Sequence, residues 1–298
     1  MRSVSMMLVC CAVISADLRA DEALPVPDRP QVAGTLLLHA RSRDRETGAV
    51  QEEEIEWAAS ETAVIICDMW DNHYCQSAAQ RVAVMAPRMN EVITAARSHG
   101  VMIIHAPSGC MDEYAGTPQR QRMRQAPHTD APFELTWCYL IPEREPEIPI
   151  KVDVSPCDDP VVGPAVRVFT RQHPKVEIIG YDGVSDSGQE IWNYCQAQGI
   201  RNVVLMGVHT NMCVLGRSFG IRQMVKLGMN VALARDLTDC MYDPREPPYV
   251  SHARGTEIVV EHIERYWCPS IEGADLMQVI PGSAGPSSEP AEKTAAAD

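Results

Sequence analysis

Cys213 has the setting of a nucleophile. It follows the short apolar run 203–206 and a polar turn that begins at Gly207, and it stands at the start of an amphipathic segment. This order predicts a buried parallel strand, a tight turn and a helix. A thiol at a helix N-terminus lies near the positive end of the dipole, so we expect its pKa to fall below the free value of about 8.5. The alternative is that Cys213 packs as a small buried hydrophobic residue.

Asp68 is the second residue in a position that favours chemistry. It lies near the end of the apolar stretch 62–70, which predicts the first core strand. The carboxyl ends of parallel strands form the ligand crevice of α/β folds, and a carboxylate there can accept a proton from a nucleophile. The alternative role for Asp68 is a cap of the following helix.

Residues 207–214 read Gly-Val-His-Thr-Asn-Met-Cys-Val and are followed by a helical pattern. This resembles the nucleophile segment of the isochorismatase-like cysteine hydrolases, a family that includes nicotinamidases and carbamoylsarcosine amidases. The resemblance implies that Cys213 attacks a carbonyl carbon and that Asp68 carries the proton to the leaving amine. It also implies a cis peptide bond between Val208 and His209, and an oxyanion bound by backbone N–H groups of this turn and of Cys213.

The resemblance further implies a cation beside the cysteine and the aspartate. Lys175 is the nearest lysine to the position at which the family carries it, and Arg171 is the substitute. A surface lysine without a role is the alternative for Lys175. Trp70 stands where the family usually has a glutamine, and we take it with His105 and Trp137 as candidate substrate-pocket residues. Trp137 has the alternative role of fixing its loop to the core.

A metal site is the less favoured expectation. Some family members bind a divalent metal through an aspartate and histidines, and Asp71, His73 and His105 lie near the corresponding strand ends. The Asp-x-His motif expected after the second strand is absent, and Cys67, His73 and Cys75 do not have a recognised zinc spacing. We therefore predict no cofactor and no metal, with a divalent cation as the alternative.

The elements that position these residues alternate between strands and helices. This order, with the resemblance over residues 62–266, predicts an α/β fold of three α/β/α layers with a mostly parallel sheet, isochorismatase-like and Rossmann-like in topology. Strands are expected at residues 62–70, 101–105, 166–170, 176–179, 203–206 and 230–234, and helices at 78–98, 190–198, 214–227 and 255–266. Pro87 is expected to kink or split the first helix.

The domain organisation is read from composition. We predict a signal peptide at 1–20, an N-terminal extension with a β-hairpin at 21–61, a hydrolase domain at 62–270, and a disordered tail at 271–298. Within the hydrolase domain, the proline-rich stretch 107–172 is expected to be a lid or insertion with short elements near 118–124 and 133–140.

Net charge and cysteine content limit the possible binding partners and the cellular compartment. A net charge of −14 and a pI near 5.1 argue against nucleic acid and against an anionic membrane surface. The signal peptide predicts export to the periplasm or the exterior, with no membrane attachment after cleavage. Cys10 and Cys11 would leave with it, and the remaining nine cysteines are an odd number, so at least one thiol should stay unpaired. The resemblance implies a homo-oligomer.

The sequence therefore predicts a hydrolase that cleaves the C–N bond of a small amide with a cysteine nucleophile. Two alternatives stay open. One is a vinyl ether hydrolase of the isochorismatase type, for which some relatives need no cysteine. The other is a catalytically inactive binding protein of the same fold.

Overall fold

The computed structural model describes residues 29–30, 33–151 and 156–282 of the chain. The predicted signal peptide at 1–20 lies outside these residues, as does the chain from 283 onward. The first part of the predicted tail is ordered, because residues 270–282 contribute two short strands and a 3₁₀ helix. The disorder prediction from 271 is therefore wrong for its first twelve residues.

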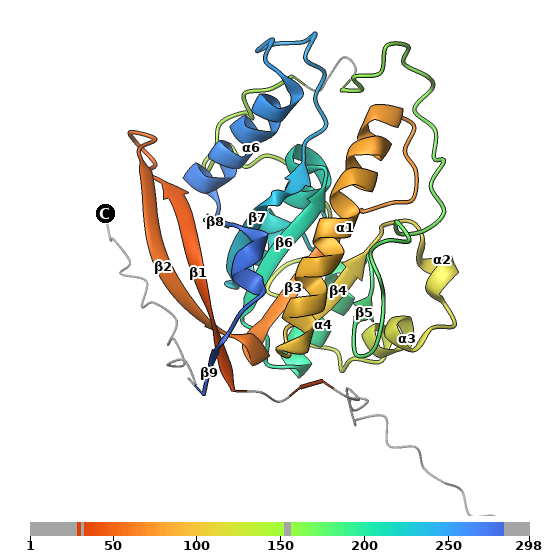
Figure 1. Cartoon of the computed structure of the whole chain (residues 1–298), viewed down its shortest axis with the longest axis vertical. Coiled ribbons are helices and arrows are strands. Elements are labelled where there is room, and N and C mark those ends of the chain that lie inside the picture. The colour runs from red at the N-terminus through yellow and green to blue at the C-terminus, as the bar shows by residue number, and fades with distance from the viewer. Residues whose placement is uncertain (1–28, 31–32, 152–155, 283–298) are drawn as a thin grey trace, which may run out of the picture.

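Nine strands of the described chain form one mixed sheet in the order β2-β1-β8-β7-β6-β3-β4-β5, with β9 paired to β1 (Figure 1). Five pairings, all among β3 to β8, are parallel, and the three pairings of β1 are antiparallel. The α/β class is confirmed. The strands are β1 Gly34–Arg43, β2 Val50–Ala58, β3 Thr62–Cys67, β4 Met102–Ala106, β5 Gly183–Val184, β6 Asn202–Val208, β7 Asn230–Asp239, β8 Ser270–Ile271 and β9 Ile280–Pro281.

Helices pack on both faces of this sheet. Val82, Met89 and Ile93 of α1 join one buried cluster with Val64 and Ile66 of β3. Helices α4, α5 and α6 pack with the opposite side chains of the same strands. The helices are α1 Gln76–Ser98, α2 Met111–Tyr114, α3 Pro118–Arg124, α4 Gly188–Ala197, α5 Ile221–Lys226 and α6 His252–Tyr266, with 3₁₀ turns η1 Ala59–Glu61 and η3 Gly273–Leu276 and a π-turn η2 Thr210–Val214. None of these helices is long and apolar enough to cross a bilayer.

Strands β3 and β6 lie side by side at the centre, and every residue of both is buried. Their apolar sequences suit a parallel strand covered on both faces. The register pairs Cys67 with Gly207, so the two strands end at the same level. The residues that follow the two strands therefore meet at the carboxyl end of the sheet.

Several predicted elements differ in the structure. Residues 166–170 and 176–179 form no strand, and Val166 and Val168 are 53% and 38% exposed. Residues 133–140 form no helix or strand, whereas α3 coincides with the predicted 118–124. Pro87 lies inside α1, which continues as one helix of 23 residues.

The segment 107–172 is fastened to the core rather than free of it. Glu145 is buried and accepts hydrogen bonds from Arg222 Nε (2.6 Å), His262 Nε2 (2.8 Å) and Trp267 Nε1 (2.7 Å). Burial alone would raise the pKa of Glu145, but these donors outweigh it and lower the pKa to about 2. An ionised carboxylate thus joins the segment to α5 and to the region of α6.

The predicted hairpin is present and extends the sheet. Strands β1 and β2 pair in register from Thr35 with Ala58 to Arg43 with Val50. Strand β2 is the outer strand in the sheet order (Figure 1), and Glu52, Glu53, Glu54 and Glu56 on it are exposed. The glutamates thus lie along an open edge.

Candidate functional site

Asp68 lies at the end of β3 with its side chain fully buried. Its Oδ1 accepts the backbone N–H of Ser108 at 2.8 Å. Its Oδ2 accepts two hydrogen bonds from Arg217, from Nε at 3.0 Å and from Nη2 at 2.9 Å. The backbone of Asp68 is left-handed, with φ of 48°. Non-glycine residues rarely adopt this conformation, and such strained positions concentrate at functional sites.

Cys213 contacts the same carboxylate. Cys213 is 7% exposed and lies in the π-turn η2, where its thiol is near enough to the Asp68 side chain and to the backbone N–H of His209 for both to shift its pKa. Burial raises the pKa of Cys213, and the Asp68 charge raises it further, while Arg217 and the His209 N–H lower it. The predicted lowering of this pKa is therefore wrong. The resting thiol is neutral, and a base must take its proton before or during attack.

Arg217 is the cation of this site, and the sequence did not identify it. It stands four residues after Cys213, one turn along the chain, and its backbone N–H donates to the Cys213 carbonyl at 3.0 Å. Burial lowers the pKa of Arg217, but the charge of Asp68 outweighs this and raises it, so the guanidinium stays charged. The signal in the sequence that could have identified Arg217 is its spacing of four residues from Cys213, which places two side chains on the same face of a helix.

Neither predicted cation occupies this position. Lys175 is exposed, and its backbone N–H donates to His173 Nδ1. Arg171 is also exposed and pairs with Glu113 at 3.6 Å. Arg217 forms the ion pair with the buried Asp68 carboxylate, so the prediction of Lys175, or Arg171 in its place, as the cation is wrong.

The turn between β6 and Cys213 has the geometry that the resemblance implied. The Val208–His209 peptide bond is cis. Gly207 just before it has φ of +104°, and an added Cβ would collide with the Cys67 carbonyl, so glycine is required there. His209 is buried, and burial lowers its pKa to about 3. Its Nε2 has no hydrogen-bond partner within the described chain. His209 is therefore a neutral imidazole.

Of the predicted pocket residues, Trp137 lies beside the catalytic candidates. The Arg217 guanidinium stands 5.4 Å from the Trp137 ring centroid, and the ring occupies the space where a side chain at position 216 would begin. The N–H of Cys138 donates to the Gly216 carbonyl at 2.7 Å. Segment 136–138 thus packs directly on the turn that carries Cys213 and Arg217.

Trp70 and His105 have other surroundings. Trp70 Nε1 donates to the Ser108 carbonyl at 3.1 Å, and its ring stacks on Phe169 at 4.2 Å, so it supports the loop that binds Asp68. Both ring nitrogens of His105 are engaged, by Gln172 at 3.1 Å and by Asp182 at 3.1 Å, and the side chain is fully buried. His105 is therefore a core residue and not a pocket residue.

The predicted alternative metal ligands are not brought together. Asp71 accepts hydrogen bonds from the N–H and hydroxyl of Thr170, and His105 is engaged as described above. His73 instead lies against His209, with ring centroids 5.1 Å apart. These positions do not converge on a common point.

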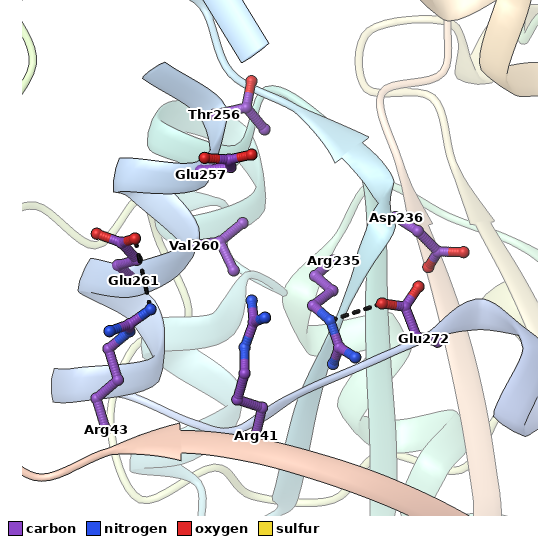
Figure 2. A pocket seen from close by; sticks show the side chains of 9 residues that line it. All are labelled: Arg41, Arg43, Arg235, Asp236, Thr256, Glu257, Val260, Glu261 and Glu272. Atoms are coloured by element: carbon purple, nitrogen blue, oxygen red, sulfur yellow. Dashed lines mark ion pairs between the residues drawn. The ribbon is translucent and has the colours of Figure 1, made fainter. Parts of the chain in front are cut away.

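A cavity of about 330 Å³ lies elsewhere, between β1, β7 and α6 (Figure 2). Arg41 pairs with Glu264, Arg43 with Glu261 and Glu264, and Arg235 with Glu272. Its arginines are thus already neutralised by the protein, and none of the Cys213 site residues lines it. We do not assign the chemistry to this cavity.

The comparisons with known proteins concern the fold. No protein-family model and no curated protein matches the chain. Similar solved structures are isochorismatase-family and cysteine hydrolase proteins. A cysteine hydrolase from Pseudomonas syringae pv. phaseolicola is 18% identical, with a TM-score of 0.41 over 74% of this chain and 92% of that one.

Two further structures are similar. An isochorismatase family protein from Burkholderia thailandensis is 14% identical, with a TM-score of 0.43 over 73% of this chain and 96% of that one. N-carbamoylsarcosine amidase from Thermoplasma acidophilum is 13% identical, with a TM-score of 0.34 over 62% of this chain and 87% of that one. At these values neither a reaction nor a substrate follows for this chain.

Proposed function

We propose that this protein is a hydrolase of the isochorismatase-like type that cleaves the C–N bond of a small amide, with Cys213 as nucleophile. The observation that carries the proposal is the buried contact of Cys213, Asp68 and Arg217 at the ends of adjacent strands. A thiol, a proton acceptor and a cation in mutual contact are the groups that nucleophilic acyl transfer requires.

The first half of the reaction forms a thioester. Asp68 accepts the Cys213 proton as the sulfur attacks the carbonyl carbon, and the negative charge moves to the carbonyl oxygen. Backbone N–H groups of the turn around His209 are the donors proposed for that oxyanion. When the intermediate collapses, the C–N bond breaks and Asp68 returns the proton to the leaving nitrogen.

The second half consumes one water. Asp68 takes a proton from water as the oxygen attacks the thioester carbon, and the C–S bond breaks with the proton returned to sulfur. Throughout, Arg217 holds the Asp68 carboxylate in place with two hydrogen bonds, and Asp68 must act twice as a base. The buried Ser108 hydroxyl has no partner in the described chain and lies beside Asp68, so we propose it as a hydrogen-bonding group for substrate.

The test is ammonia or amine release from a panel of small primary amides and N-carbamoyl compounds. We expect Cys213→Ala to abolish release. Cys110→Ala is the matched control, because Cys110 is another buried thiol near Asp68 and should be dispensable. Full activity of the Cys213 variant on a substrate that the wild type hydrolyses would refute the role of Cys213 as nucleophile.

Variants at Cys213 and Asp68 distinguish amide hydrolysis from hydrolysis of a vinyl ether. Because the resting thiol is neutral, a reaction that needs only Asp68 is the second candidate. It predicts hydrolysis of a vinyl ether substrate that survives Cys213→Ala and is lost in Asp68→Asn. The amide hydrolase predicts loss in both variants.

A further inference from the structure

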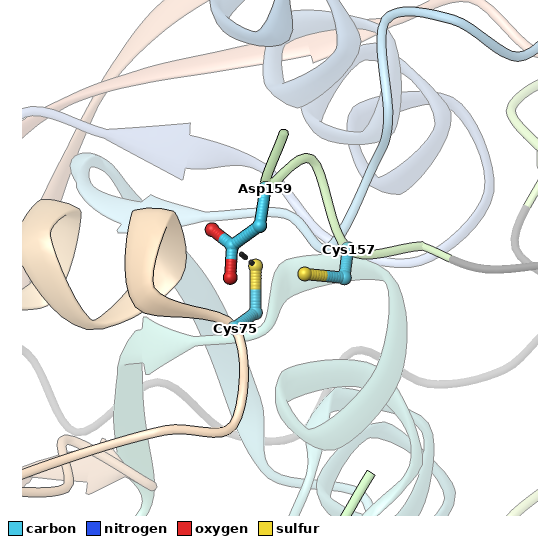
Figure 3. A group of neighbouring side chains, drawn as sticks. All are labelled: Cys75, Cys157 and Asp159. Atoms are coloured by element: carbon cyan, nitrogen blue, oxygen red, sulfur yellow. Dashed lines mark hydrogen bonds between the residues drawn. The ribbon is translucent and has the colours of Figure 1, made fainter. Parts of the chain in front are cut away.

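Two thiols and a carboxylate converge at the start of α1, outside the proposed catalytic site. Cys75 is the residue that precedes α1, and Cys157 and Asp159 come from the segment after the gap at 152–155. Their two sulfurs and a carboxylate oxygen all lie within 4.8 Å of one another (Figure 3). All three residues are buried, at 0%, 0% and 7% exposure. They are brought together by folding alone, since about 80 residues separate the two segments.

The carboxylate of Asp159 is held in a fixed orientation. Its Oδ2 accepts the backbone N–H of Gln76 and its Oδ1 accepts that of Ser77, both at 2.8 Å. Burial would raise the pKa of Asp159, but the hydrogen bonds at the helix start outweigh it and hold the pKa well below the usual range. Oδ1 also accepts the Cys75 thiol, and Oδ2 keeps a lone pair for a further partner. Carboxylate ligands of metals are commonly oriented by such outer hydrogen bonds.

The thiols face negative groups. Cys75 Sγ lies 3.7 Å from Asp159 Oδ1 and 3.5 Å from Asp158 Oδ1. Burial and the neighbouring Cys157 thiol raise the pKa of Cys75 to about 12, so the Cys75 sulfur stays protonated unless a cation joins it. Asp158 already has its own cation, because Arg81 Nη1 donates to it at 2.7 Å.

We propose that Cys75, Cys157 and Asp159 bind one thiophilic divalent cation of the zinc class. Two thiolates and one carboxylate suit such an ion, whose tetrahedral shell leaves a fourth position for a water. Binding releases two thiol protons to solvent, and the set then carries three negative charges against two positive ones. The N-terminus of the long helix α1 favours the remaining negative charge. The cation would tie the segment around Cys157 to the start of α1.

This site is independent of the proposed function, because none of its three ligands contacts Cys213, Asp68 or Arg217 through any hydrogen bond of the described residues. It also differs from the alternative set Asp71, His73 and His105 that the resemblance implied. A loss of metal would leave the catalytic assignment standing.

The test uses the full-length protein isolated without chelator. We expect about one zinc per chain by elemental mass spectrometry, and after exchange with Co²⁺ a near-ultraviolet band from thiolate-to-cobalt charge transfer. Cys75→Ala and Cys157→Ala should each lose the band and weaken binding by more than about tenfold. Cys195→Ala is the matched control, because Cys195 is a buried thiol on α4 whose pKa burial also raises to about 12.

Two aspartate variants test the metal site even if a cysteine variant does not fold. Asp159→Asn should weaken cobalt binding, whereas Asp158→Asn, which alters the neighbouring acid outside the ligand set, should retain it. The proposal is overturned if the wild type binds no metal, or if the charge-transfer band survives both cysteine variants. A disulfide between Cys75 and Cys157 in the isolated protein, seen as a mass two hydrogens lower, would also overturn it.

Discussion

Asp68→Asn should accelerate alkylation of Cys213 while it abolishes hydrolysis. The negative charge of the Asp68 carboxylate raises the pKa of the Cys213 thiol and so disfavours the thiolate. Asparagine has nearly the same shape without the charge, and it leaves the Arg217 guanidinium free to favour the thiolate instead. Because iodoacetamide reacts with the thiolate, the alkylation rate follows the ionised fraction of Cys213.

The expected size of the effect follows from the contact. Two unit charges about 4 Å apart interact by about 4 kcal/mol at an effective dielectric constant of about 20. Arg217 offsets part of this in the wild type, and each 1.4 kcal/mol is about tenfold in the ionised fraction. We therefore expect the rate to rise by roughly 10- to 1000-fold at pH 8.

The assay is a time course of iodoacetamide labelling, read by mass spectrometry of the peptide that contains Cys213. Reading one peptide is necessary because the described chain has nine buried free cysteines. Asp71→Asn is the control, since Asp71 bonds to Thr170 and does not influence the Cys213 pKa. If Asp68→Asn labels at the wild-type rate or more slowly, the electrostatic account of this site is wrong.

Two further predictions concern ion pairs. Arg217→Met should lower amide hydrolysis by roughly 10²- to 10⁴-fold, since the general base Asp68 loses the two hydrogen bonds that hold its carboxylate in place. Arg217→Lys should recover part of the lost activity, and Lys175→Ala should hydrolyse the amide at the wild-type rate. If Lys175→Ala lost as much activity as Arg217→Met, the assignment of Arg217 as the cation of the site would be contradicted. Glu145→Gln should cost about 3 kcal/mol of unfolding free energy in urea at pH 7. Because folding lowers the pKa of Glu145 to about 2, its contribution is full above about pH 4.5 and is lost as the pH falls toward 2. Between pH 4.5 and 2 the unfolding free energy of the variant should therefore fall less steeply than that of the wild type, and an equal slope would refute the stabilising role of ionised Glu145.

The core strands could be predicted because their sequences carry a strong local signal. Segments such as 63–67 and 203–206 are apolar throughout, as is typical of parallel strands covered on both faces. The segment 166–179 also contains valines and isoleucines, but among the described residues it pairs only through one isolated bridge, between Gln172 and Trp70. Whether an apolar stretch becomes a strand depends on a neighbouring strand, which local sequence does not specify.

Asp68 and Cys213 could be found because strand ends are marked in the sequence. Arg217 could not be singled out, because its spacing from Cys213 fits many surface arginines. What directs it inward is its packing beside Trp137 and its reach to a strand 149 residues away. The thiol pKa was mispredicted for a related reason: the helix dipole is a local effect, whereas burial and the Asp68 charge come from the assembled fold.

The open edge of β2 bears on how copies of this chain could associate. A second β2 strand aligned beside the first would bring Glu52, Glu53, Glu54 and Glu56 against their counterparts, and like charges opposite one another repel. Charged edge strands discourage continuation of a sheet from one molecule into the next. Two copies of this chain are therefore expected to associate through a surface other than the β2 edge, and these glutamates protect the protein against edge-to-edge aggregation.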